Sequence, residues 1–491
     1  MVILYNPPSS ASRKPILPMS LLALGALLEG EHEYRIIDGN LLADGVNGLE
    51  RLIRETGADV LGVTVMPGPQ LRDAVPTCRE IKRRFPQLTI VWGGYFPTQH
   101  YDVCLRTDFV DYVVCGHGEL IFKSLLDILA NQGDPTGLQG LAWRDGATGE
   151  VRCGSPGPIP HPDHLPDFPY RRVEMERYVR RTFMGNRTLS HHSSYGCPFS
   201  CNFCAVVNMV NGRWLAQSAE HAAEVVKLLA RDYGVDSVEF HDNNFFTDEA
   251  RSAEFSERIM DQRIGWWGEA RIDTLLKYSA KSWRLLRDSG LKMVFLGAES
   301  GADETLRRMN KGGTASADKT LAIAAVMKEY DIVPEMSFVL GNPPDPEADM
   351  RLTMEFIRKV KRVNPQTEII LYLYTPVPLA GTLYDQARSA GFRFPTDIEE
   401  WISPEWQEFS QRRSTHLPWL QDPVRRTVRD FQWVINAYYP TATDIGMSAV
   451  KRFLLRALGS WRYHLRIYRH PLELRAFHKL LSYQRPETDG F

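Results

Sequence analysis

The sequence lacks a long apolar run. The longest, from Leu21 to Leu28, is far shorter than the roughly 20 residues that a membrane-spanning helix needs. No basic stretch precedes an apolar one at the N-terminus, where Met1 runs directly into Val2. We therefore expect no signal peptide and a cytoplasmic location.

The sequence also lacks an excess of basic charge. Its net charge is −2 over 491 residues, so there is no general surface for a phosphate backbone, and we expect no nucleic-acid partner. With 43% apolar and 24% charged residues, the chain has the composition of a globular protein rather than a disordered one. Its length predicts two or three domains.

The sequence also has few cysteines that could form disulfide pairs. There are seven cysteines, an odd number, and three of them share one short stretch. A disulfide framework is therefore not expected, which also favours the cytoplasm.

That short stretch runs from Tyr195 to Cys204 and spaces its three cysteines as C-x3-C-x2-C. Thiolates are the preferred protein ligands of iron–sulfur clusters and also bind zinc. Closed structural sites usually take four protein ligands, so three leave one coordination position open for chemistry. The alternative interpretation is a zinc site completed by His191 or His192.

The first 135 residues alternate strand-like and helix-like segments. We predict helices at 21–28 and 71–85. The predicted strands are 2–5, 34–38, 60–65, 89–92 and 112–115. This pattern indicates a doubly wound parallel sheet, in which ligands bind outside the carboxyl ends of the strands. The residues predicted at those ends are Asp38, Thr64 to Met66, Gly93, Gly94 and Gly116.

Residues 136–188 differ in composition. Residues 141–151 resemble a hairpin with Asp-Gly and Thr-Gly turns, and six prolines between Pro156 and Pro169 exclude regular structure. We interpret this segment as an interdomain connector. Cys153 within it has no neighbouring cysteine in sequence, and we expect a free thiol without a partner.

From about residue 189 strands and helices alternate again. Ser218 is placed to cap a helix over 219–231, and strands are predicted at 237–240, 265–270, 292–297, 335–340 and 368–374. Polar residues follow several of these strands, which in a βα repeat is where chemistry is found. Residues 396–491 are aromatic and basic with helical spacing. They predict an ordinary helical cap, and the alternatives are contacts with an anionic, apolar substrate or with a membrane surface.

The cysteine stretch, with Phe203 before its last cysteine, resembles the signature of the radical S-adenosylmethionine (SAM) superfamily. The resemblance implies a partial (β/α)6 barrel. In it a [4Fe-4S] cluster on Cys197, Cys201 and Cys204 binds SAM and cleaves it by one electron into methionine and a 5′-deoxyadenosyl radical. Three later segments resemble that family position by position, and the residues they assign to SAM binding, together with Phe203, are Asp242, Asn243, Arg271, Glu299 and Ser300. Taken alone, Glu299 could instead cap a helix.

The first 135 residues resemble the cobalamin-binding domain that precedes many radical SAM domains. Asn40 stands where the usual fingerprint has the histidine that ligates cobalt. The alternative is a domain that serves only as a scaffold. The residues that the resemblance assigns to cobalamin are Asp38, Asn40, Thr64, Met66, Gly93, Gly94, Gly116 and Glu119.

The predicted fold is α/β: an N-terminal doubly wound, Rossmann-like sheet, a partial (β/α)6 TIM-type barrel, and a mostly helical C-terminal region. The predicted domains are 1–135, 136–188, 189–395 and 396–491. The resemblance implies an enzyme that methylates an unactivated carbon or phosphorus of a small-molecule or lipid-like substrate, with flavodoxin or ferredoxin as electron donor. The alternatives are oxidative cyclisation, as in anaerobic magnesium-protoporphyrin ester cyclases, and a zinc-stabilised cobalamin sensor. No residue is identified as a catalytic acid or base.

Overall fold

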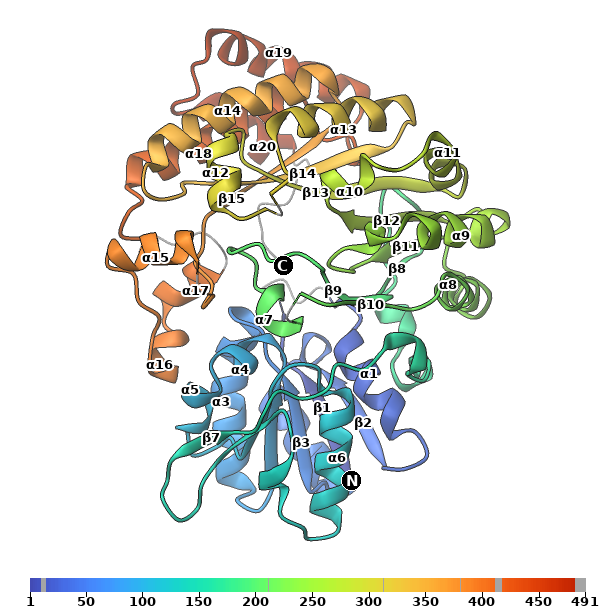
Figure 1. Cartoon of the computed structure of the whole chain (residues 1–491), viewed down its shortest axis with the longest axis vertical. Helices are drawn as coiled ribbons and strands as arrows, with labels where there is room; N and C mark the ends of the chain where they lie inside the picture. The colour runs from blue at the N-terminus through green and yellow to red at the C-terminus, as the bar shows by residue number, and fades with distance from the viewer. Residues whose placement is uncertain (10–14, 211, 312, 380, 411–416, 482–491) are drawn as a thin grey trace.

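The structure is a computed structural model that describes residues 1–9, 15–210, 212–311, 313–379, 381–410 and 417–481. Two sheets with helical coverings make up most of it (Figure 1). The first sheet lies at the bottom of that view, the second above it, and three late helices lie at the top.

The first sheet has seven strands in the order β2-β1-β3-β4-β5-β6-β7. Its first five strands pair in parallel, in the 2-1-3-4-5 order of one of the two common doubly wound folds. The strands are β1 (Val2–Asn6), β2 (Tyr34–Asp38), β3 (Val60–Thr64), β4 (Thr89–Gly93), β5 (Tyr112–Val114), β6 (Leu141–Arg144) and β7 (Val151–Cys153).

Helices cover both faces of this sheet, as the doubly wound prediction requires. Side chains alternate along β1, so that Ile3 and Tyr5 enter one core, with α2 and α3, while Val2 and Leu4 enter the other, with α1 and α6. The helices are α1 (Met19–Leu28), α2 (Gly45–Thr56), α3 (Pro69–Arg84), α4 (Tyr95–Gln99), α5 (Tyr101–Leu105) and α6 (Gly118–Ala130).

The hairpin formed by β6 and β7 corrects two expectations. It pairs antiparallel with β5, so the first sheet continues past residue 135 into what we expected to be connector. Cys153 at its end is a free thiol but is not without a partner. Hydrogen bonding with the Cys153 thiol, together with burial, raises the pKa of Cys115.

The second sheet is parallel, with strand order β15-β14-β13-β12-β11-β8. Each strand pairs with the next one along the chain, apart from the short hairpin β9 (Ser194–Gly196) and β10 (Trp214–Ala216), and β8 and β15 form the two edges of the sheet. The strands are β8 (Thr188–His191), β11 (Ser237–Phe240), β12 (Gly265–Ala270), β13 (Leu291–Glu299), β14 (Val333–Leu340) and β15 (Glu368–Leu373).

Helices between these strands pack on one face of the sheet. Ser218 caps the first long one through the His221 amide, as predicted. The fully buried Trp266 on β12 packs with Phe240, Phe245 and Phe255 at the centre of this core. The helices are α7 (Val206–Val210), α8 (Ala219–Tyr233), α9 (Glu249–Ile259), α10 (Ile272–Leu275), α11 (Ala280–Asp288), α12 (Asp303–Arg308), α13 (Ala317–Glu329), α14 (Pro346–Val363) and α15 (Thr382–Ser389).

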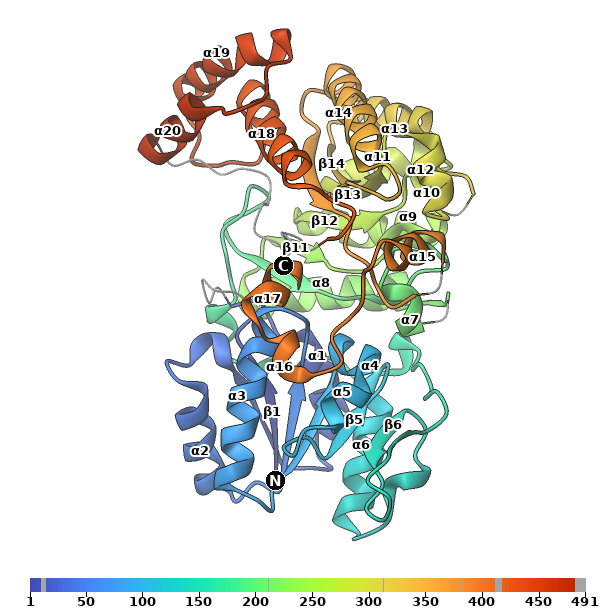
Figure 2. The same cartoon turned by 90° about the vertical axis from the view of Figure 1, so that its left-hand side faces the viewer.

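The C-terminal region is helical, as predicted, and contacts both sheets (Figure 2). Trp401 packs edge-on against Phe96 of the first domain, with ring centroids 5.1 Å apart, and Glu399 pairs with Arg79 of α3. Phe431 and Ile435 enter the core of the second sheet. The helices are α16 (Ile398–Trp401), α17 (Pro404–Ser410), α18 (Asp422–Tyr438), α19 (Ala449–Leu465) and α20 (Leu472–Leu481).

The carboxyl ends of the first sheet face the second domain. The chain begins at the end of β1 that lies away from the second domain in Figure 1. Two hydrogen bonds join the domains at the other end. Asn208 of α7 donates to Gln99 of α4 at 2.7 Å. Tyr195 Oη donates to Glu119 Oε1 at 2.7 Å. The residues predicted to bind two different cofactors therefore lie on opposite sides of one interface.

Candidate functional site

The cysteine loop leaves β9 at Gly196, where the backbone can only be glycine. Its φ is +78°, and a Cβ there would lie 2.4 Å from the Arg213 carbonyl oxygen. The loop thus turns back sharply and carries the three cysteines toward the carboxyl ends of the second sheet. Cys201 is buried, and Cys197 and Cys204 are partly buried.

Two hydrogen-bond donors from neighbouring strands reach the sulfurs. Arg271, just after β12, places Nη1 3.3 Å from Cys201 Sγ, and Asn244, after β11, places Nδ2 3.8 Å from Cys197 Sγ. Hydrogen bonds of this kind stabilise anionic sulfur and tune an iron–sulfur centre.

The thiols also influence one another. Burial raises the pKa of Cys197 and raises that of Cys204 to about 11, and negative charge on the neighbouring cysteines contributes to both shifts. Because iron binds the thiolate, metal must displace these protons. The loop therefore supplies three close soft donors, which fits a cluster that takes one thiolate on each of three irons.

The zinc alternative needs a fourth ligand. Both ring nitrogens of His191 already have partners, with Gln217 Oε1 at 3.2 Å and Tyr170 Oη at 3.3 Å. The ring of His192 lies 5.6 Å from that of Tyr195. In the described part of the chain no group of three or more His, Cys, Asp and Glu side chains is arranged to hold a single metal ion.

Arg271 and Glu299 are each held by a buried ion pair beside the loop. Arg271 forms a two-point contact with Asp273, at 3.0 Å for each bond, and lies 3.8 Å above the centre of the Phe199 ring. Glu299 accepts a hydrogen bond from Lys311 Nζ at 2.5 Å. Glu299 and Lys311 are both largely buried, so removing either would leave an uncompensated charge.

Glu299 does not serve as a helix cap. The residue that precedes α12 is Ala302, without a capping side chain. Glu299 has a positive φ of 62° at the end of β13, a conformation that costs a non-glycine residue of order 1–3 kcal/mol. Gly297 makes room for its side chain, because a Cβ there would lie 2.2 Å from Glu299 Oε1.

The other residues predicted for SAM are distributed unevenly. Asp242 is fully buried and accepts two hydrogen bonds from Ser193, whereas Asn243 is exposed and its neighbour Asn244 faces Cys197. The Ser300 hydroxyl is directed to Asp349 and Thr353 of α14, away from the loop. Phe203 is partly buried, with Lys311 Nζ 5.8 Å from its ring centre.

A buried polar chain runs across the carboxyl ends of β1, β2 and β3. Gln70 accepts from the Met66 amide and donates to Asn6, and Asn6 donates to Asp38. The second oxygen of Asp38 is buried without a hydrogen bond. The strand order places this chain at the switch point between β1 and β3, where doubly wound folds bind ligands.

Asn40 is immobilised in that chain. Its Nδ2 donates to Asp38 at 2.8 Å and its Oδ1 accepts from the Ser9 amide at 3.0 Å. An amide fixed by two neighbours is not positioned as a cobalt ligand, so the residues present fit a cobalamin bound without a protein ligand from this position.

Two glycines with positive φ lie after the carboxyl ends of β4 and β5. Gly94 has a φ of +98°, and a Cβ there would meet Thr64 Oγ1 and the Val65 carbonyl oxygen at 3.2 Å. A Cβ on Gly116 would meet nothing within 4 Å. Thr64 is partly buried and Met66 is 48% exposed. A side chain at Gly94 would therefore meet the domain itself, whereas the open space at Gly116 fits close approach of a large ligand.

Glu119 faces the second domain. Burial favours its neutral form, but the hydrogen bond and charge of His117 and the Tyr195 hydroxyl outweigh this, so the pKa of Glu119 is lowered. It thereby couples the crevice to the strand that precedes Cys197.

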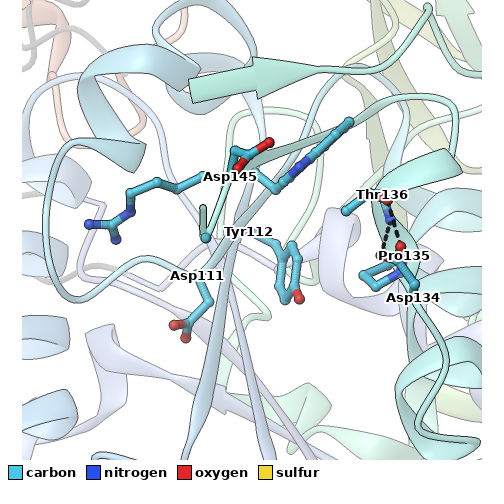
Figure 3. A pocket seen from close by; sticks show the side chains of 9 residues that line it. Asp111, Tyr112, Asp134, Pro135, Thr136 and Asp145 are labelled. Atoms are coloured by element: carbon cyan, nitrogen blue, oxygen red, sulfur yellow. Dashed lines mark hydrogen bonds between the residues drawn. The ribbon is translucent and has the colours of Figure 1, made fainter. Parts of the chain in front are cut away.

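A separate pocket of about 460 Å³ lies at the opposite end of the first sheet (Figure 3). It is lined by Asp111, Tyr112 and the turn from Asp134 to Thr136, with Asp145 of the hairpin. These residues precede β5 or follow α6, so the pocket is far from the carboxyl ends and from the cysteine loop.

Comparison with known protein families gives a match for each of the two domains. The B12 binding domain family matches residues 11–126, and the radical SAM superfamily matches residues 192–357. The chain therefore carries a B12-binding domain followed by a radical SAM domain. It is an enzyme of the cobalamin-dependent, methyltransferase-like group, whose cofactors are a [4Fe-4S] cluster, SAM and cobalamin.

Relatives cover most of the chain. An uncharacterized methyltransferase of Pyrococcus horikoshii is 27% identical over 370 residues, which is 73% of this chain and 78% of that protein. The anaerobic magnesium-protoporphyrin IX monomethyl ester cyclase of Synechocystis is 26% identical over 363 residues, 69% of this chain and 70% of that one.

A solved structure shares the fold. The radical SAM methyltransferase TsrM of Kitasatospora setae, with cobalamin and a [4Fe-4S] cluster bound, superposes with a TM-score of 0.66 at 17% identity, covering 98% of this chain and 99% of that one. A second structure of TsrM holds its tryptophan substrate and a SAM analogue.

Four residues near these sites were not identified from the sequence. They are Asn6, Gln70, Asn244 and Lys311, each of which contacts a predicted site residue. Asn244 directly follows Asp242 and Asn243, the two residues that were predicted to bind SAM. The sequence offered no signal for the other three.

Proposed function

We propose that this enzyme transfers a methyl group from SAM to an unactivated carbon or phosphorus of a small molecule. The observation that carries the proposal is the placement of the two candidate sites on opposite sides of one interface, joined by the Tyr195–Glu119 hydrogen bond. Cobalamin in the crevice and SAM at the loop could then act on the same substrate.

The bound cofactors would supply methyl-carrier and radical chemistry, so that two SAM and two electrons convert C–H to C–CH3 and release S-adenosylhomocysteine, methionine and 5′-deoxyadenosine. An electron donor such as flavodoxin or ferredoxin would provide the electrons. Cys197, Cys201 and Cys204 would hold the cluster.

The chain's own residues would bind and orient SAM. Arg271 offers a planar guanidinium suited to a carboxylate, although Asp273 now occupies two of its donors. Glu299 offers a carboxylate for the ribose hydroxyls, with Lys311 as its counter-charge. Asp242 and Phe203 would support the same site, while Asn243 and Ser300 are less well placed, one exposed and one turned to α14.

In the crevice, Asp38 and Asn40 would fix the polar floor, and Thr64, Met66, Gly93, Gly94 and Gly116 would admit the corrin or its tail. Glu119 would connect this floor to the second domain. The alternative role, a purely structural domain, does not require the open space at Gly116.

The inner face of the second sheet is the candidate substrate space. Trp267 and Glu269 lie two residues apart on β12 and so share a face, opposite the one that Trp266 buries against helices. Trp267 Nε1 donates to Glu335 on β14, at 3.1 Å. Carboxylates on this face favour a substrate group that is neutral or cationic there, rather than an anion.

Oxidative cyclisation remains the second candidate, because a magnesium-protoporphyrin ester cyclase is among the relatives. The zinc-stabilised sensor, a function of another class, has less support, because His191 is already engaged and because Arg271 and Asn244 contact the sulfurs. We also propose a cytoplasmic location.

The test is anaerobic reconstitution with iron, sulfide, cobalamin and SAM, followed by reduction in an extract of cells from which the gene has been deleted. Methyl transfer predicts that S-adenosylhomocysteine accumulates together with 5′-deoxyadenosine and that label from methyl-deuterated SAM enters a product. Formation of 5′-deoxyadenosine without S-adenosylhomocysteine would support cyclisation instead. A zinc protein that makes neither product would reject both.

A further inference from the structure

Helix α19 packs by one face only. Leu455, Gly459 and Tyr463 are buried against α18, and the rings of Tyr463 and Tyr438 stack with centroids 4.2 Å apart. A Cβ on Gly459 would lie 2.9 Å from Ala437 Cβ, so the two helices touch closely there.

The opposite face of α19 is apolar and exposed. On a helix of 3.6 residues per turn its apolar positions fall within a stripe of about 120°, centred nearly opposite Leu455 and Gly459. The exposed side chains are Val450 at 67%, Phe453 at 71%, Leu454 at 43%, Trp461 at 45% and Leu465 at 66%.

The adjoining segment is similarly exposed. Ile467 is 44% exposed, and Leu472 and Leu480 on α20 are 66% and 82% exposed. Nine of the fourteen large apolar side chains that are exposed in the described part of the chain lie between Ile445 and Leu480. Scattered apolar residues are normal on a surface, whereas a concentration of this kind marks an interaction site.

The segment that carries this apolar face is basic, although Arg462, Arg466 and Arg475 in it form ion pairs with Glu473, Glu355 and Asp430. Residues 449–481 contain eight lysines and arginines and one glutamate, a net charge of +7 in a chain whose net charge is −2. Arg456, Arg466, Arg469 and Lys479 are exposed. A second copy of the chain would bring a face of the same charge, so like charges oppose self-association there.

We propose that α19 and α20 form a docking surface for an anionic lipid bilayer. Phe453, Trp461 and Leu465 would enter the boundary between headgroups and acyl chains, and the basic side chains would bind the lipid phosphates. No helix in the described ranges is long and apolar enough to cross a membrane, so the contact would be interfacial. This surface is independent of the methyl-transfer proposal.

The test is co-sedimentation of the full-length protein with vesicles of phosphatidylcholine, with and without phosphatidylglycerol. We expect binding that requires phosphatidylglycerol and weakens with salt. The double variant F453E/W461E should reduce it about tenfold or more, because it removes both aromatic anchors and adds charge. R456E/R469E should also weaken binding and should flatten its salt dependence.

Leu352→Glu is the control, since Leu352 is 52% exposed on α14 and the change replaces an exposed apolar side chain by one negative charge, where F453E/W461E adds two. Circular dichroism and SAM cleavage should be unchanged in every variant. Equal binding by wild type and F453E/W461E would overturn the proposal, as would an equal loss in the control. A dimer in light scattering that only F453E/W461E separates would assign the face to a second copy instead.

Discussion

At the carboxyl ends of the first sheet, the candidate cofactor residues hold one another through neutral and singly charged hydrogen bonds, from Gln70 through Asn6 to Asp38 and Asn40. At the second sheet, the corresponding residues are held by buried ion pairs, Arg271 with Asp273 and Glu299 with Lys311. The first arrangement fixes a buried polar chain at the carboxyl ends of β1, β2 and β3. The second arrangement places two buried ion pairs beside three thiols. A charged cofactor bound there could replace Asp273 or Lys311 as the partner of Arg271 or Glu299.

The largest difference between the two regions is expected when a cysteine of the second domain is replaced. Cys201→Ala should abolish both cluster assembly and SAM cleavage, because three thiolates hold the cluster and none is spare. Iron analysis and 5′-deoxyadenosine formation measure this. Cys153→Ala is the control, since Cys153 is exposed and its loss costs no core packing; it should keep full iron content. A complete, active cluster in Cys201→Ala would refute the assignment.

The candidate cobalamin site can be tested without changing the cysteine loop. Gly94→Val should lose most bound cobalamin and keep the cluster, because its side chain would crowd Thr64 and Val65 and strain a φ of +98°. Cobalamin absorbance and iron content measure this. Gly57→Ala also places a side chain at positive φ, +62°, in the less strained left-handed region, and it meets nothing within 4 Å at the other end of the domain. If both variants lose cobalamin equally, strain rather than the crevice is responsible.

The ion-pair side is tested at Glu299. Glu299→Gln should weaken SAM affinity roughly tenfold to a hundredfold, since it removes charge-assisted hydrogen bonds of about 1.5–3 kcal/mol each. It should also lower the melting temperature, because Lys311 would be left buried and uncompensated. Adding Lys311→Met should restore stability but not affinity. Unchanged affinity in Glu299→Gln would contradict the cofactor role.

The smallest effect is expected on the inner face of the second sheet. Burial, reinforced by Asp242, raises the pKa of Glu269 to about 7. A carboxyl whose pKa is raised on folding loses stability as pH rises from about 4.5 to about 7, an upper bound of about 3 kcal/mol. Glu269→Gln should therefore gain stability relative to wild type at pH 8 and not at pH 5. Urea unfolding at the two pH values measures it, and a constant difference would contradict it.

Sequence reasoning located the strands closely because buried parallel strands are short, continuous apolar runs with glycines at their ends. The strands at 34–38, 237–240 and 265–270 agree residue for residue. The three cysteines and Glu299 each lie in a short contiguous segment, so these residues could be assigned to a site from the sequence alone. The end of the first sheet was misplaced because a hairpin with ordinary turns carries no signal of which strand it will join.

The partners of site residues were harder to predict. Lys311 reaches Glu299 from beyond α12, and Gln70 reaches Asn6 from sixty-four residues away. Such pairs depend on how a helix and a loop pack against the strand ends, which a single sequence does not encode locally. Likewise, Cys115 and Cys153 meet only because β7 runs back along β6.

Helix α16 follows the second domain in sequence but packs against the first. This matters for the construction of chimeras in which the N-terminal domain is exchanged between relatives. Phe96 and His100 of the B12-binding domain pack against Trp401, and Arg79 pairs with Glu399. A donor fragment cut from the N-terminal residues alone would leave that apolar face uncovered. The portable unit is therefore discontinuous, and a chimera should carry the segment around Ile398–Trp401 together with the domain it covers.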